Sequence, residues 1–169
     1  MDVVEMKYLL IIILFFSSNI YSQTFWNWGK AVHLSSSAAS GLSSGFADHN
    51  SVLKYASTNE ARIYYDKMYH NYQTLERTLF VTAGFSIPLS SEFKPIRTFS
   101  DILLSLTWQG VFHNLGQNLA RNKPLFWKSD YQSVNNTSGF EQFAGPEYQI
   151  TAFISVLVIN YLVYTLLNE

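Results

Sequence analysis

The pattern of apolar and polar positions divides the chain into two apolar ends and a mixed middle. A short apolar run, residues 8–16, follows Lys7, and an uncharged apolar run occupies residues 150–167. Three further segments read as helices, at about residues 26–47, 57–87 and 98–120. The pattern therefore predicts an all-α chain, folded as a small helical bundle of about four helices once residues 1–22 are removed.

Helix boundaries are predicted from capping residues and prolines. Ser57 followed by Glu60 fits a capping box at the start of the second helix. Pro88 is expected to end that helix, because proline cannot donate the next backbone hydrogen bond. Thr98 and Asp101 form a similar start for the third helix. Residues 125–149 are rich in Asn, Ser, Gly and aromatic side chains and are expected to form a long irregular loop.

The C-terminal apolar run predicts a helix over about residues 147–167. Pro146 stands where a first-turn proline belongs, and the run is long enough to span a bilayer. We expect this helix to be transmembrane. The alternative is a buried central helix of a soluble bundle, which has a similar composition.

The N-terminal segment, residues 1–22, has the order of regions of a secretory signal peptide: a basic residue, an apolar stretch and a small residue, Ser22. It resembles signal peptides of Bacteroidota, whose cleavage leaves a residue such as Gln23 at the new terminus. The prediction is a single helical, membrane-associated domain, residues 23–169, exported to the bacterial cell envelope. The alternative is an uncleaved N-terminal anchor.

Composition restricts the chemistry. Charged residues make up only 14% of the chain and the net charge is −1, which excludes nucleic-acid binding by a broad basic surface. There is no cysteine, so disulfides, thiolate metal sites and a lipoprotein anchor are excluded. No metalloprotease, EF-hand, Walker A or dinucleotide-binding motif is found. We therefore expect no metal and no cofactor.

The first predicted helix is built largely from Ser, Ala and Gly. Its Gly41-x-x-x-Gly45 pattern lets a neighbouring backbone approach closely, although a soluble helix pair would use it too. The first half of the second predicted helix is crowded with tyrosines, which suit a boundary between water and lipid. The alternative is that these tyrosines cover a soluble core.

Two polar stripes carry the candidate chemistry. The first helix places five polar residues on one face: Lys30, His33, Ser37, Ser40 and Ser44. The third helix repeats a polar residue every four positions, at Asp101, Ser105, Gln109, His113 and Gln117, with Asn114 beside the fourth. Facing stripes would enclose a wet interior, whereas in a soluble bundle each stripe would face water. The catalytic candidates are His33, His113 and Asp101, and the binding candidates are Lys30, Ser37, Gln109 and Asn114.

A family resemblance rests on two of these segments. The sequence from Gly29 to His33, GKAVH, and the small-residue helix after it resemble the opening of the YfiM-like family of bacterial envelope proteins. The stretch from Asp101 to Gly116 is similar to a later segment of that family. The chain departs from the pattern at Gly29, where the family has an acidic residue, and in lacking the lipoprotein cysteine. The resemblance implies an envelope context and no particular activity.

These observations favour an accessory or structural protein of the bacterial envelope over an enzyme. Its expected partners are membrane lipid and other envelope proteins. One alternative is an integral-membrane enzyme acting on a lipid or envelope substrate, with His33 or His113 as general base and Lys30 contacting an anion. The other is a soluble periplasmic bundle that binds an apolar ligand or partner.

Overall fold

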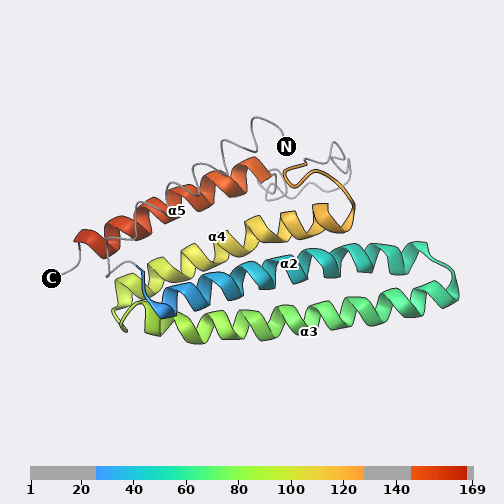
Figure 1. The fold of residues 1–169 in the computed structure, drawn as a ribbon, viewed down its shortest axis with the longest axis horizontal. Helices are drawn as coiled ribbons and strands as arrows, with labels where there is room; N and C mark the ends of the chain where they lie inside the picture. Colours follow the sequence, from blue (N-terminus) through green and yellow to red (C-terminus); the bar gives the residue numbers. More distant parts are fainter. Residues whose placement is uncertain (1–25, 128–145, 167–169) are drawn as a thin grey trace.

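The computed structural model describes residues 26–127 and 146–166. These ranges contain four helices and no strand: α2 (Trp28–Ala56), α3 (Asn59–Ser90), α4 (Pro95–Ala120) and α5 (Pro146–Leu166) (Figure 1). The predicted all-α fold with about four helices is therefore confirmed. The signal segment, and residues 128–145 of the predicted loop, lie outside the described residues.

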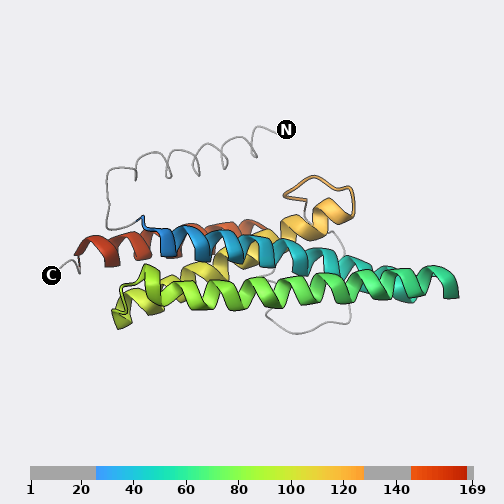
Figure 2. The same cartoon turned by 60° about the horizontal axis from the view of Figure 1, so that its bottom comes forward.

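Successive helices run in opposite directions, so α2 and α4 are parallel to each other (Figure 1). Helix α2 packs along both α3 and α4, and α5 packs against α4. The hairpin formed by α2 and α3 reaches past the ends of the other two helices in both views (Figure 2). We call its outer part, residues 48–77, the hairpin tip.

The boundary between α2 and α3 differs from the prediction. Asn27 caps α2 by accepting a hydrogen bond of 2.8 Å from the backbone N–H of Lys30, and the helix continues to Ala56, beyond the predicted end at residue 47. Ser57 ends this helix in an extended conformation, and Thr58 precedes α3 without a side-chain capping bond. The predicted capping box at Ser57 is therefore wrong, because Ser57 is used to end one helix and not to start the next.

The end of α3 is also set differently. Pro88 lies inside the last turn, and the helix continues to Ser90. The chain leaves the helix at Glu92 and Phe93, which both have a positive φ, 53° and 58°. The backbone N–H of Phe93 donates to the carbonyl of Pro88 at 3.0 Å, which closes the turn. The left-handed backbone conformation of Glu92 and Phe93, and not the proline, therefore ends the helix.

Helix α4 begins three residues before the predicted start. Pro95 occupies the first turn, where its missing N–H costs nothing, and Thr98 already lies inside the helix. Asp101 points into the bundle, so it does not cap the helix. The predicted end at Ala120 and the start of α5 at Pro146 are confirmed.

Glycines set the distance between the parallel helices α2 and α4. A Cβ at Gly45 would lie 2.5 Å from the backbone nitrogen of Gln117, and a Cβ at Gly41 would overlap the carbonyl oxygen of Gln109. From the other side, a Cβ at Gly116 would lie 2.5 Å from the carbonyl oxygen of Leu42. The two backbones touch, which is the close approach that the Gly41-x-x-x-Gly45 pattern predicts.

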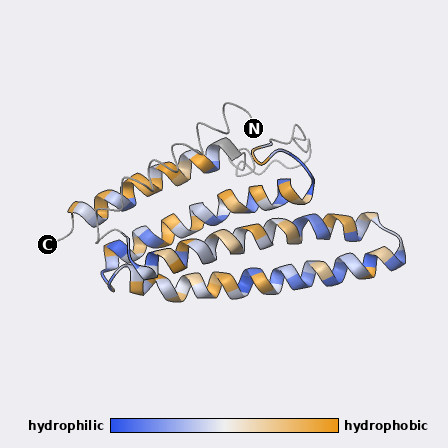
Figure 3. Ribbon diagram, viewed as in Figure 1, coloured by the Kyte–Doolittle hydropathy of each residue, from blue (hydrophilic) through white to orange (hydrophobic). Residues whose placement is uncertain are grey.

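The distribution of polarity is inverted relative to that of an ordinary soluble domain. Among the described residues, sixteen polar or charged side chains are buried, against ten apolar ones. The apolar core is small and lies between α2, α4 and α5, where Trp108 packs on Phe153 with ring centroids 4.3 Å apart. Many large apolar side chains face outward instead, and α5 is coloured mostly as hydrophobic in Figure 3. Buried polar groups must therefore find partners inside the bundle.

We expect Gly45→Ala to destabilise the fold by about 1–3 kcal/mol, because its Cβ would push α2 away from α4. Thermal unfolding of the purified chain measures the effect. Gly84→Ala is the matched control, because a Cβ there meets nothing within 4 Å. The control substitution is expected to stabilise the helix by up to about 1 kcal/mol. Equal effects at both glycines would contradict the close contact.

Candidate functional site

A network of buried polar side chains surrounds Asp101 near the start of α4. Its members come from all four helices and are all buried; we call them the Asp101 network: Lys30, Ser90, Ser100, Asp101, Asn160 and Tyr164. The side chains of Lys30 and Asp101 have no exposed surface. A buried carboxylate is tolerated only when it is paired with opposite charge and fully hydrogen-bonded.

One carboxylate oxygen of Asp101 contacts α2 and α5. Its Oδ1 lies 3.2 Å from the ammonium of Lys30 and accepts a hydrogen bond of 2.7 Å from the amide nitrogen of Asn160. The amide oxygen of Asn160 in turn accepts a hydrogen bond of 2.7 Å from Lys30, and its nitrogen also donates to Ser100 at 2.6 Å. Asn160 therefore uses both ends of its amide, and it joins α5 to α2 and α4.

The other carboxylate oxygen contacts α3 and α5. The hydroxyl groups of Ser90 and Tyr164 both donate to Oδ2 of Asp101, the second at 2.6 Å. The Tyr164 hydroxyl also lies 2.9 Å from the carbonyl oxygen of Ser90, so one proton is placed between two acceptors. A single carboxylate thus holds side chains from α2, α3 and α5 against α4.

Two cations lie over the ring of Tyr164. The Lys30 ammonium is 3.5 Å from the ring centroid, and the guanidinium carbon of Arg97 is 4.8 Å from it. Arg97 is itself buried and forms an ion pair of 2.9 Å with Glu92 in the α3–α4 turn. Cation–π contacts of this kind gain strength where water is excluded.

The Asp101 carboxylate is saturated by its four partners. An ionised carboxylate offers about four lone-pair positions, and Lys30, Asn160, Ser90 and Tyr164 occupy them. A general base needs a free lone pair that a substrate can reach. In this arrangement the Asp101 carboxylate offers no free lone pair to a substrate, and its catalytic role stays a prediction.

His33 is the exception to this satisfied network. Its side chain is fully buried one turn along α2 from Lys30, and its Nε2 lies 3.9 Å from Oδ2 of Asp101, too far for a hydrogen bond. Among the described residues, neither ring nitrogen of His33 has a hydrogen-bond partner. A buried polar group without a partner costs free energy, so it calls for a functional or structural explanation.

The predicted polar stripes of α2 and α4 do face each other. The hydroxyl groups of Ser37 and Ser105 are hydrogen-bonded, and Gln109 donates to Ser40 at 3.1 Å. Ser44, the last member of the α2 stripe, is only half-buried. These direct bonds join the two stripes along the contact between α2 and α4.

His113 and Asn114 lie away from both the network and the hydrogen bonds of Ser37 and Gln109. His113 is twelve residues beyond Asp101 on α4, or about 18 Å along the helix. Its Nε2 lies 3.4 Å from the carboxylate of Asp48 and 3.1 Å from the amide of Gln117, in a partly exposed position. The structure therefore brings Lys30, His33 and Asp101 together but leaves His113 and its neighbour Asn114 outside.

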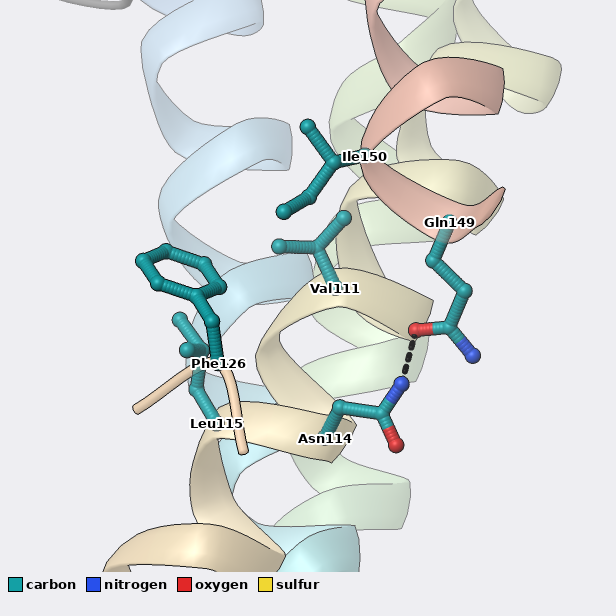
Figure 4. Close-up of a pocket in the computed structure, with 6 residues that line it drawn as sticks. All are labelled: Val111, Asn114, Leu115, Phe126, Gln149 and Ile150. Atoms are coloured by element: carbon teal, nitrogen blue, oxygen red, sulfur yellow. Dashed lines mark hydrogen bonds between the residues drawn. The ribbon is translucent and has the colours of Figure 1, made fainter. Parts of the chain in front are cut away.

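Asn114 lines a shallow hollow between α4, α5 and residues 125–127. Figure 4 shows its side chain donating to the amide oxygen of Gln149, a hydrogen bond of 2.5 Å. The other walls are apolar: Val111, Leu115, Phe126 and Ile150. Even with the open space at its mouth, the hollow spans about 160 Å³, less than the roughly 300–1,000 Å³ of ligand pockets.

The hairpin tip carries charges in a different setting. Lys54 of α2 and Asp66 of α3 form an ion pair of 2.5 Å on its surface. This hydrogen bond raises the pKa of Lys54 and lowers that of Asp66. Here solvent stabilises both charges.

Within residues 26–127 and 146–166, no three histidine or acidic side chains gather as a metal site requires.

Sequence reasoning missed Arg97, Asn160 and Tyr164 as site residues. Asn160 and Tyr164 are four residues apart in the apolar C-terminal run, so they share one helix face. Polar groups on one face of an apolar span are the signal that could have identified them. Arg97 stands four residues before Asp101 on α4, the same spacing.

We expect Asp101→Asn to destabilise the fold by about 3–5 kcal/mol, because it leaves the Lys30 ammonium buried beside a neutral amide. Unfolding of the detergent-solubilised chain measures this effect. Asp48→Asn is the matched control, since that carboxylate is half exposed, and it should change stability by less than about 0.5 kcal/mol. Adding Lys30→Met to Asp101→Asn should recover part of the loss. If Asp101→Asn leaves the free energy of unfolding unchanged, the network does not stabilise the fold.

Comparisons with known proteins add no constraint on this site. No family model, no curated protein and no solved structure matches the chain. The resemblance of GKAVH and its following helix to the YfiM-like family stays a prediction.

Proposed function

We propose that this chain is an accessory or structural protein of the bacterial cell envelope, anchored in a membrane by α5. In this role the Asp101 network is an internal lock that fixes the apolar helix α5 to the other three helices. The contacts of Asn160 and Tyr164 support the proposal, because they are polar side chains on a helix otherwise suited to lipid.

The observation that carries the proposal is the character of α5. Residues Tyr148–Leu166 form the one helix of the described chain that is long and apolar enough to cross a membrane, with a mean hydropathy of 1.7. Only 28% of this segment is buried inside the bundle. The core helix of a soluble protein would be mostly buried, so the remaining apolar surface of α5 needs another cover.

The closed state of the network favours a structural role over catalysis. Lys30 is fully buried and occupied by Asp101 and Asn160, so it is not placed to contact an anionic substrate. Asp101 has no free lone pair. Polar groups that are satisfied within an apolar surrounding hold helices together.

The envelope location rests on the sequence. Residues 1–22 have the pattern of a secretory signal peptide, and the GKAVH segment resembles an envelope family. Both are consistent with a membrane-anchored chain that is exported. N-terminal sequencing of the mature protein tests the export: a chain that begins at Gln23 is expected, and an intact N-terminus would contradict cleavage.

We expect the full chain to stay in the membrane pellet after carbonate extraction, because α5 is integrated and not peripherally bound. Ile159→Lys with Leu162→Lys places two charges on the outward face of α5 and should weaken insertion by roughly 3 kcal/mol each. The double variant should therefore shift to the supernatant. Ile63→Lys with Tyr64→Lys, at exposed positions of the hairpin tip, is the control and should stay in the pellet. Release of the unmodified chain would overturn the proposal.

A second candidate function is favoured by His33 alone. Its two free ring nitrogens, buried beside Asp101, suit a group that accepts a proton during a reaction on a lipid or envelope substrate. This candidate requires the bundle to open, because His33 has no exposed surface. This candidate is the integral-membrane enzyme that the sequence offers as an alternative, with His33 as the general base in place of His113.

His33→Leu separates the two roles. If His33 is only a buried side chain, removing its unpaired nitrogens should leave stability unchanged or raise it by up to about 1–3 kcal/mol, with normal function. If His33 is a base, the variant should be abundant and folded but inactive in complementation of a deletion strain. Protein abundance and complementation, measured together, decide between them; His113→Gln serves as the comparison.

A further inference from the structure

Most of the exposed large apolar side chains of the described residues gather at one end of the bundle, although the hairpin tip exposes others, among them Tyr55 and Ile63. The side chains at this end lie on residues 78–90 of α3, 96–106 of α4 and 157–166 of α5, and we call this surface the apolar belt. Phe85 is 79% exposed, and Phe99 is 63% exposed. The start of α2 adds Trp28, which is 86% exposed, and Val32. Such side chains are far more exposed than the surface of a soluble protein normally allows.

Exposed charges are absent from the same stretch. No charged residue occurs in residues 78–90 of α3 or in residues 148–166 of α5. On α4, Arg97 and Asp101 are buried, and residues 102–120 contain no charge. Exposed charged side chains lie beyond the belt, in the α3–α4 turn at Glu92 and Lys94 and on the hairpin tip.

All four helices contribute to this surface, which argues for a surrounding medium. A protein partner would cover one face, whereas the belt faces outward from α2, α3, α4 and α5 at the same end of the bundle. Lipid chains cover every outward face at once. The Asp101 network occupies the interior at that same end, so polar groups lie inside and apolar groups outside. A bilayer imposes this arrangement. In hydrocarbon, a charged side chain that faces the lipid costs more free energy than one that is paired inside the bundle.

We propose that the whole belt end of the bundle, and not α5 alone, is immersed in the hydrocarbon of a bilayer, with the hairpin tip projecting into water. This inference rests on the proposed membrane role and extends it to α3 and α4. The uncharged stretch at the end of α3, residues 78–90, has thirteen residues and measures about 20 Å, less than the roughly 30 Å of hydrocarbon. Of the tyrosines of the hairpin tip, Tyr72 then lies nearest the headgroups, about 9 Å along α3 from the belt, where such a side chain is favoured.

The test uses single cysteines, since the natural chain has none. Phe85→Cys and Phe99→Cys report on the belt, Ile159→Cys on α5 and Ile63→Cys on the hairpin tip; all four positions are exposed, so no packing is lost. Each variant of the full chain is labelled with an environment-sensitive fluorophore and reconstituted in phosphatidylcholine vesicles. Brominated acyl chains and aqueous iodide then serve as quenchers.

Labels at 85, 99 and 159 are expected to lose most of their fluorescence to brominated lipid and little to iodide, and the label at 63 should show the reverse. Iodide quenching at 85 and 99, with lipid quenching at 159, would overturn the inference but leave the α5 anchor intact. Iodide quenching at all three positions would overturn the anchor as well. Shielding of 85 and 99 from both quenchers would mean that a protein, such as a second copy of this chain, covers the belt, which also overturns the inference.

Discussion

The buried carboxylate of Asp101 is the constraint on which the rest of the structure depends. Its charge is acceptable inside the bundle only because Lys30 neutralises it and three further donors complete its hydrogen bonds. These partners come from α2, α3 and α5, so satisfying one side chain fixes the positions of three helices relative to α4. The relation is reciprocal, since Lys30 is equally buried and equally dependent on Asp101. Loss of either partner leaves a charge that the interior cannot solvate.

A second constraint is the close approach of α2 and α4. Their parallel backbones meet at Gly41, Gly45 and Gly116, and the serines between them form hydrogen bonds across the contact. Close backbone packing and polar pairing therefore stabilise this contact in addition to the apolar core between α2, α4 and α5. Both gain from an apolar surrounding, which the proposed bilayer would supply.

The site was only partly predictable. The stripe of Lys30 and His33 on one helix and Asp101 on the other could be found from spacing alone, and the structure places these three side chains together. His113 belongs to the same stripe as Asp101 but lies three helical turns away. The spacing of polar residues predicts which helix face they share, but not which of them meet at the same level along the helix axis. Asn160 was missed because its partners Lys30 and Asp101 are 130 and 59 positions away, although its spacing from Tyr164 marks one polar face of the apolar run.

The sequence by itself determined the helical class, the uncharged C-terminal helix and the glycines that bring two helices into contact, because these depend on local composition and spacing. The sequence misplaced the helix ends at Ser57, Pro88 and Thr98. The backbone conformation of the turns, including the positive φ angles, sets these ends, and residue types do not specify it. Only the tertiary structure decided that direct hydrogen bonds join the polar stripes and that four side chains surround the Asp101 carboxylate. Those outcomes depend on contacts between residues as distant as Lys30 and Asn160, 130 positions apart, which pair only once α5 is packed on α4.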